Sequence, residues 1–258
     1  MGVLNVTPDS FSDGGVHFDR SRAIDSALQM ERDGAAMVDV GGESTRPGAE
    51  PVSAEKELER VVPVIEEIRR RSSIPISVDT MKAAVASAAI EAGADIINDV
   101  TALRFDPQMR RLAAERSVPV ILMHMRGEPR SMQNSIHYDD LMSEIAIELT
   151  AWRDQALTAG IRSDRIFVDP GIGFGKTFDH NLEILARCGE LRSIAPVLIG
   201  ASRKAFIGQL TGRSGSTRMA GSLAAVAAAA RGGAVIVRVH DVQATVDFLR
   251  VFGAIGKY

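Results

Sequence analysis

The segment SAEKELERVVPVIEEIRRRSSIPISVD, residues 53–79, predicts one helix followed directly by one strand. Ser53 stands where a helix N-cap is expected, and residues 75–79 have the short apolar character of a strand. Between them, apolar residues recur at spacings of three and four, which places them on one helix face: Leu58, Val61, Val62, Ile65 and Ile68. The segment therefore predicts an amphipathic helix that packs on a sheet.

The same alternation of helix and strand runs along the whole chain. Gly-Ala pairs at 34–35, 93–94 and 233–234 stand where a helix should end, just before the next strand. Several strands are apolar on both faces, as in a parallel sheet covered by helices. Eight strands are predicted, at 3–6, 36–40, 75–79, 95–100, 118–124, 165–169, 196–201 and 234–239. Eight βα units without a linker predict an α/β protein with a single domain over residues 1–258, a (β/α)8 TIM barrel. A doubly wound open sheet is the alternative.

The composition limits the kinds of partner. Of 258 residues, 45% are hydrophobic and 24% are charged, as in ordinary globular proteins. The net charge of −3 provides no basic field for nucleic acid. The single cysteine, Cys188, allows no internal disulfide, which fits a reducing compartment. No apolar run approaches the ~18 residues of a membrane span. We therefore expect a cytoplasmic protein that acts on small molecules, without nucleic acid or membrane partners.

The stretch VDPGIGFGKT, residues 168–177, resembles a phosphate-binding loop but matches neither common type. A P-loop would need glycine where Pro170 stands, and the dinucleotide fingerprint would need glycine where Lys176 stands. Asp169 at its start would repel a phosphate. An aspartate ahead of a glycine-rich turn suits a ligand with N–H donors better.

Polar side chains follow each predicted strand, at the end where a barrel carries its active site. Asp79, Asn98 and Asp169 could surround a flat heterocycle rich in N–H groups, whereas Asn5 could hold Mg²⁺ that carries phosphate oxygens. Four further residues could hold an anion or a leaving group: Arg203, Lys204, Arg238 and His240. Burying so many polar groups is costly unless a ligand pairs them, which favours an enzyme.

Structural roles remain open for several of these residues. Asn5 could cap a turn, and Asp79 could cap the following helix. His124 could be a packed core histidine, and Arg203 could pair with Asp9 or Asp13. We interpret Asp39 and Asp99 as strand-end residues, and Lys176 and Thr177 as the start of a helix.

Eight motifs in order along the chain resemble dihydropteroate synthases of bacterial folate synthesis. They are MGVLNVTPDSFSDGG (1–15), VDVGGESTRPGA (38–49), SVDT (77–80), IINDV (96–100), LMHM (122–125), DPGIGFGKT (169–177), GASRKAFIG (200–208) and VRVHDV (237–242). The family usually carries a short segment before the first motif, which here begins at Met1. The motif positions otherwise hold the expected residue types.

The resemblance implies that 6-hydroxymethyl-7,8-dihydropterin diphosphate is joined to p-aminobenzoate, with release of diphosphate. It implies that Lys204, Arg238 and Asp79 are the catalytic residues. The expected pterin diphosphate site consists of Thr45, Asp79, Asn98, Asp169, Phe174, Lys204, Arg238 and His240. The expected p-aminobenzoate site consists of Phe11, Thr45, Pro47, Ser202 and Arg203. Asn5 would bind Mg²⁺.

The resemblance also implies loops that fold over the site, a homodimer, and competitive inhibition by sulfonamides. Residues 216–233 could form the dimer contact or pack against the barrel. Corrinoid-linked methyltransferases share such a barrel and pterin pocket but would lack the diphosphate-binding residues. A non-catalytic relative should have lost a cationic or acidic residue at the strand ends, and none is missing.

Overall fold

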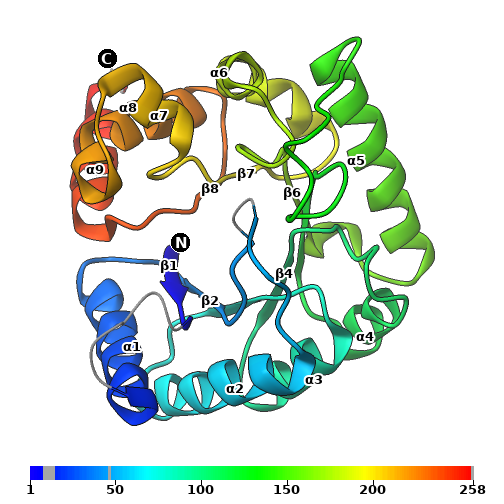
Figure 1. Ribbon diagram of the computed structural model, residues 1–258, viewed down its shortest axis with the longest axis vertical. Helices are drawn as coiled ribbons and strands as arrows, with labels where there is room; N and C mark the ends of the chain where they lie inside the picture. Colours follow the sequence, from blue (N-terminus) through cyan, green and yellow to red (C-terminus); the bar gives the residue numbers. More distant parts are fainter. Residues whose placement is uncertain (8–14, 46–47, 257–258) are drawn as a thin grey trace.

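The computed structural model describes residues 1–7, 15–45 and 48–256, which form a closed barrel of parallel strands inside a ring of helices (Figure 1). The strands are β1 Gly2–Asn5, β2 Val38–Gly41, β3 Ile76–Asp79, β4 Ile96–Asp99, β5 Val120–Met123, β6 Ile166–Asp169, β7 Leu198–Ile199 and β8 Ile236–Val237. The α-helices are α1 Gly15–Arg32, α2 Ala54–Arg71, α3 Ala83–Glu91, α4 Met109–Arg116, α5 Leu141–Thr158, α6 Phe178–Arg187, α7 Ala205–Thr211, α8 Met219–Arg231 and α9 Val242–Ile255. The connections within the described ranges include the 3-10 helices η2 Ser163–Arg165, η3 Cys188–Ser193 and η4 Gly215–Arg218.

Isolated bridges join the two sheets at two places and so close the barrel. Strands β1 to β6 pair in sequence order, and β7 pairs with β8. A bridge from Val168 to Val197 joins β6 to the β7 side, and a bridge from Gly2 to Val239 joins β8 to β1. The Val3 N–H also donates to the Val239 carbonyl at 3.0 Å. The prediction of a (β/α)8 barrel is confirmed, and the open-sheet alternative is wrong.

Strand residues alternate between two separate cores. Val38 and Val40 of β2 pack outward into the large core shared with the helices, together with Ile65 and Ile68 of α2. Ile96, Ile121 and Leu198 belong to a small core inside the barrel, on which Met1, Met37, Phe167 and Ile236 pack. Because successive strand residues point to opposite faces, the residue between Val38 and Val40 must point into the barrel.

The helix α2 begins and ends where the sequence predicts. The Ser53 side chain accepts the Lys56 N–H at 3.4 Å, and Val61, Ile65 and Ile68 are fully buried. The last two strands are shorter than predicted, with two residues each. Val197 and Val239 beside them form isolated bridges, each with backbone hydrogen bonds to a neighbouring strand.

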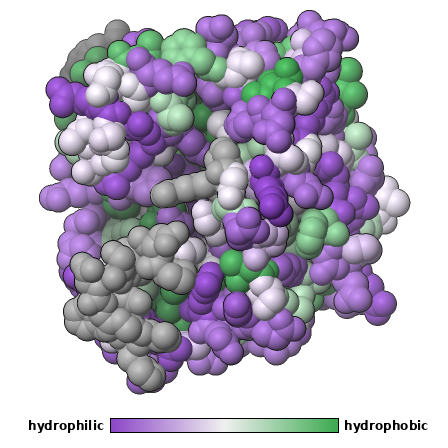
Figure 2. All heavy atoms as spheres, viewed as in Figure 1, coloured by the Kyte–Doolittle hydropathy of each residue, from purple (hydrophilic) through white to green (hydrophobic). Residues whose placement is uncertain are grey.

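Hydrophilic side chains dominate the side of the molecule seen in Figure 2, and hydrophobic side chains occur there in small separate groups. Among the described residues, no helix combines the length and apolar character needed to cross a membrane.

The prediction that a helix ends at Gly93 can be tested by substitution. The φ of Gly93 is +113°, and a Cβ there would lie 2.8 Å from Cγ of Arg69, so Gly93→Ala should lower the free energy of unfolding by about 1–2 kcal/mol. Gly253→Ala is the matched control, because Gly253 lies within α9 with open space around it. That change should raise the free energy of unfolding by about 0.5–1 kcal/mol. Urea denaturation measures both, and equal shifts would contradict the argument.

Candidate active site

Arg238, directly after β8, lies inside the barrel between two carboxylates. Its Nε is 2.6 Å from Oδ2 of Asp39, and its Nη2 is 2.8 Å from Oδ2 of Asp79. The Asn98 side-chain amide donates to the same Asp39 oxygen at 3.1 Å. Asp79 of β3 pairs in register with Asn98 of β4, so both side chains point to the barrel interior, next to the position of Gly41 on β2. The guanidinium thus connects the end of β8 with β2 and β3.

Burial and ion pairing act against each other in this cluster. Burial raises the pKa of Asp79; Arg238 opposes the rise and Asp39 adds to it. Burial would lower the pKa of Arg238, but the Asp39 and Asp79 carboxylates outweigh it and raise that pKa. Oδ1 of Asp39 is buried and has no hydrogen-bond partner among the described residues. One guanidinium therefore faces two carboxylates, an arrangement that N–H donors from a ligand would stabilise.

Asp169 ends β6 and begins a tight turn. Its Oδ1 accepts the Gly171 N–H at 2.8 Å, and burial raises its pKa to about 6. Gly171 has φ +72°, and a Cβ there would lie 1.9 Å from the backbone oxygen of His124, so only glycine fits. A Cβ on Gly200 would lie 3.8 Å from both Oδ2 of Asp169 and Cβ of Arg238. Asp169 and Arg238 therefore flank the same small residue.

Lys204 brings a second cation to this part of the site. Its Nζ lies 4.3 Å from the ring centroid of Phe174, which is within the range of a cation–π contact. A Cβ on Gly173 would approach Cδ of Lys204 to 3.2 Å, so glycine lets the lysine pass over the turn. The charge of Lys204 also lowers the pKa of Asp169, against the larger effect of burial. The predicted group of Asp169, Phe174 and Lys204 is thus brought together.

His240 and Ser202 form a neighbouring pair. Ser202 Oγ accepts the His240 N–H at 3.2 Å and lies 3.1 Å from Nδ1 of the same residue. Burial, followed by the charges of Arg203 and Arg238, lowers the pKa of His240 to about 4. The imidazole is therefore neutral at pH 7 and could donate only one ring N–H.

Arg203 pairs with an acid that the sequence analysis does not single out. Its Nε lies 3.1 Å from Oδ2 of Asp241, and its Nη2 contacts Oδ1. Arg203 has φ +58°, a region that favours glycine, and Ser222 Oγ accepts its N–H at 3.0 Å. Asp241 is the residue after His240, whereas Asp9 and Asp13 lie outside the described residues.

Of four further residues predicted for the site, Asn5 and Thr45 lie in the described part of the chain, and Phe11 and Pro47 do not. Asn5 pairs in register with Gly41, which pairs in turn with Asp79, so Asn5 lies on the same side of the barrel as Asp79. Thr45 follows β2 by four residues and is partly buried. Phe11 and Pro47 lie outside the described residues.

Comparison with known proteins identifies the family. A family model described as pterin binding enzyme matches residues 1–240. The dihydropteroate synthase of Escherichia coli (strain K12) is 49% identical over 258 residues, spanning 98% of this chain and 90% of the relative. The chain belongs to the dihydropteroate synthase family.

Solved dihydropteroate synthase structures share the whole fold. The Xanthomonas albilineans enzyme with 4-aminobenzoic acid superimposes with a TM-score of 0.94 at 48% identity, covering 100% of this chain and 93% of that one. The Yersinia pestis enzyme with a sulfonamide drug complex gives a TM-score of 0.95 at 46% identity, covering 100% and 94%.

Sequence reasoning missed Asp39 in this dihydropteroate synthase site. We interpreted it as a strand-end residue, but it is fully buried in the ion pair with Arg238. The signal was present, because an aspartate between Val38 and Val40 must face the barrel interior when its neighbours face the helices. A buried carboxylate there requires a cation.

Other structural alternatives can now be decided. Asp79 does not cap α3, since the Ala83 N–H donates to Asp106 instead. Asp99 does have the structural role we expected: it accepts the N–H groups of Thr101 and Leu103. Thr177 is the N-cap of α6, as predicted.

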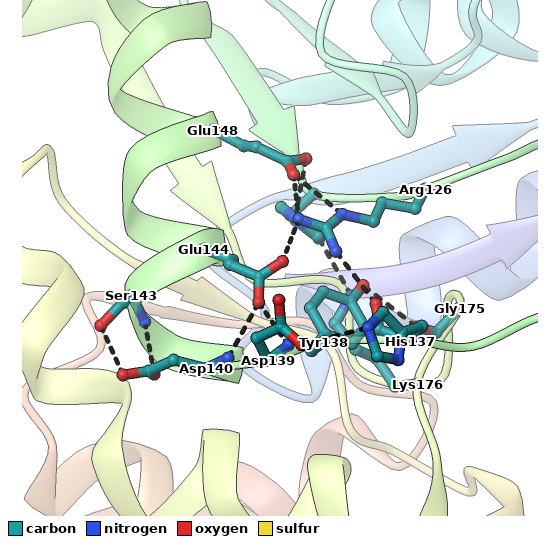
Figure 3. A network of polar contacts seen from close by, with 11 residues as sticks. Arg126, His137, Tyr138, Asp139, Asp140, Ser143, Glu144, Glu148, Gly175 and Lys176 are labelled. Atoms are coloured by element: carbon teal, nitrogen blue, oxygen red, sulfur yellow. Dashed lines mark hydrogen bonds and ion pairs between the residues drawn. The ribbon is translucent and has the colours of Figure 1, made fainter.

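His124 and Lys176 form a buried network beneath the turn after β6. Nζ of Lys176 lies 3.0 Å from Nδ1 of His124 and donates to the Phe174 carbonyl at 3.0 Å. Nε2 of His124 lies 3.2 Å from Oε2 of Glu148. Figure 3 shows Glu148 and Glu144 of α5 on either side of Arg126, with Lys176 close to Tyr138. His124 is therefore a core residue, and Lys176 anchors the backbone of Phe174.

Burial and neighbouring charges together set the protonation states of the side chains in this network. Burial lowers the pKa of His124 to about 4 and that of Lys176 to about 7. Burial alone would raise the pKa of Glu148, but His124 and Arg126 lower it to about 2. Lys176 thus begins to lose its proton near neutral pH, unlike an ordinary lysine.

Lys176→Met should remove a pH dependence of stability. The folded chain releases the Lys176 proton near pH 7, whereas the unfolded chain keeps it up to a pKa near 10.5. The unfolded state therefore binds more protons in this window, and wild-type stability should rise with pH relative to the variant. The difference in free energy of unfolding should grow by about 2 kcal/mol between pH 7 and 9.

Urea denaturation at the two pH values measures this change. Lys56→Met is the control, because Lys56 is exposed on α2. A wild-type advantage that stays constant with pH would contradict the depressed pKa.

Proposed function

We propose that this chain joins 6-hydroxymethyl-7,8-dihydropterin diphosphate to p-aminobenzoate, giving 7,8-dihydropteroate and diphosphate. The observation that carries this proposal is the set of Asp79, Asn98 and Asp169 at the strand ends, largely shielded from water, beside the cations Arg238 and Lys204. Its relatives support the same chemistry, since Xanthomonas albilineans structures hold 4-aminobenzoic acid and 7,8-dihydropteroate.

The pterin would bind through its ring edge inside the barrel. Asp79 and Asp169 are carboxyl groups whose pKa values burial raises, so each suits a ring N–H or amino group as partner. Asn98 can both donate and accept, and its amide is already oriented by Asp39. Phe174 and Lys204 would close the remaining side of the ring.

Bond cleavage would separate diphosphate from the pterin methylene. The C–O bond breaks with its electron pair going to diphosphate, and the remaining cation is delocalised into the pterin ring. Arg238 stays charged because of Asp39 and Asp79, so it is available beside the leaving group without a proton transfer. The neutral His240, held at Ser202, would donate a ring N–H to a phosphate oxygen, and Thr45 would bind the same diphosphate.

The amine of p-aminobenzoate would then attack the methylene carbon. A C–N bond forms from the nitrogen lone pair, and the nitrogen afterwards loses one proton. An arylamine attacking a cation needs no strong base, so exclusion of water is the main requirement. We propose that Phe11, Thr45, Pro47, Ser202 and Arg203 line this second site.

The side-chain oxygen of Asn5 is a donor that suits magnesium, and we propose Asn5 as the protein ligand of this ion. Among the described residues, no three His, Cys, Asp or Glu side chains converge on a metal position. Magnesium commonly binds through one or two protein oxygens, with waters and substrate phosphates completing the shell. Bound there, it would neutralise charge on the diphosphate. Diphosphate binding that is unaffected by EDTA would contradict this assignment.

We also propose a cytoplasmic homodimer. The helix α9 exposes Val251 and Ile255, and α8 beside it carries the small-residue segment noted in the sequence. Four residues of α8, Ser222, Ala225, Val226 and Ala229, are already buried within the chain, so only its other face could contribute to a dimer. A monomer in sedimentation velocity at micromolar concentration would contradict the proposal.

Lys204→Ala should abolish most turnover without unfolding the chain. Loss of this cation beside Asp169 and Phe174 should lower kcat/KM by about 10²–10³-fold, as for other charged transition-state contacts. Diphosphate release with Mg²⁺ is measured with and without p-aminobenzoate, together with amine incorporation. Arg250→Ala is the control, since Arg250 is exposed on α9. No release by the wild type under any condition would favour a methyltransferase-like or non-catalytic protein.

Sulfonamides should inhibit this enzyme in competition with p-aminobenzoate. The relative from Yersinia pestis was solved with a sulfonamide drug complex at 46% identity to this chain. Initial rates at several p-aminobenzoate concentrations should show a raised KM with unchanged kcat. Inhibition that saturating p-aminobenzoate does not relieve would contradict a shared site.

A further inference from the structure

Three charged side chains form a buried cluster beside the start of the loop after β2. Nζ of Lys82 lies 2.5 Å from Oε2 of Glu57 and also contacts the Glu43 carboxylate. The side chains of Lys82 and Glu43 are only 15% and 8% exposed, and that of Glu57 is fully buried. Each comes from a different part of the fold: the loop after β2, helix α2, and the turn between β3 and α3.

Glu43 connects both ends of the loop that carries Thr45. Its Oε1 accepts the Val52 N–H at 3.0 Å, while its Oε2 contacts Lys82. Arg60 of α2 donates to the Gly42 carbonyl at 2.7 Å, which fixes the residue before Glu43. The two ends of segment 43–52 are thus attached to each other and to the helical layer.

Lys82 is the charge that makes this arrangement stable. Burial would lower its pKa, but the hydrogen bonds to Glu43 and Glu57 raise it above the ordinary value. Without the ammonium, two buried carboxylates would face each other with no counter-ion. Glu43 is closer to the loop and less buried than Glu57, so Glu43 is the group that would move away.

We propose that Lys82 is a positioning residue for the second substrate: by holding Glu43, it fixes Thr45 at the mouth of the barrel. The inference rests on the proposed function, in which Thr45 lines the p-aminobenzoate site. Lys82 does not belong to the pterin-edge set of Asp79, Asn98 and Asp169. Replacing it should therefore weaken the binding of p-aminobenzoate and leave the binding of the pterin ring unchanged.

Steady-state kinetics of Lys82→Met and Lys82→Arg test the inference. The methionine variant should raise KM for p-aminobenzoate about tenfold. Its affinity for 6-hydroxymethylpterin, which lacks the diphosphate, should stay within about twofold by calorimetry. The arginine variant keeps the charge and should recover most of the loss. Arg111→Met is the control, because it removes an exposed ion pair on α4.

Glu43→Gln is the second variant, for the case that Lys82→Met does not fold. It keeps the shape and leaves the pair of Lys82 and Glu57 in place, so the chain should remain folded. It should raise KM for p-aminobenzoate in the same direction. Unchanged KM in the folded variants, or equal losses for the amine and the pterin, would overturn the inference. Absence of wild-type turnover would instead contradict the proposed function.

Discussion

The guanidinium of Arg238, held between two carboxylates, is the contact on which the arrangement of the site depends. It joins the last strand to β2 and β3 through Asp39 and Asp79, at 2.6 and 2.8 Å. Two carboxylates inside a barrel would repel each other and be poorly solvated, so without this cation the interior would not keep its present form. The arginine also orients Asn98 indirectly, since both donate to the same Asp39 oxygen. The stabilising ion pair and the proposed ligand-binding surface therefore share the same side chains.

This cluster leaves acceptor capacity unused, which is what a heterocycle with several N–H groups requires. Oδ1 of Asp39 has no partner among the described residues, and burial raises the pKa values of Asp79 and Asp169. Free carboxylates in water would not need a ligand, but desolvated ones gain from any donor that reaches them. The cost of burying them is met by packing elsewhere, mainly in the core between strands and helices.

Most of the fold and much of the site could be predicted from the sequence, because strand alternation and the glycine positions are local signals. The Gly-Ala pairs after α1, α3 and α8 do carry glycines with positive φ, at 92°, 113° and 77°. Asp79, Asn98 and Asp169 could be placed on one rim because parallel strands share their direction. The partners of the charged groups could not be predicted. Asp39 with Arg238 and Arg203 with Asp241 are pairs separated by 199 and 38 residues, and pairing at such distances depends on side-chain geometry.

The two proposed subsites are built on different parts of the fold, and this difference favours an order of binding. The pterin-edge residues stand on strand ends inside the closed barrel, and the turn at Gly171 tolerates no side chain. In the proposed function, the second substrate depends instead on Thr45 of the loop after β2, whose position we infer to be set through Glu43 and Lys82. Strand ends inside a closed barrel can receive the pterin without rearrangement, whereas an amine bound first at the mouth would obstruct the pterin's entry. The pterin diphosphate should therefore bind before the amine, because its determinants lie deeper and are already in place.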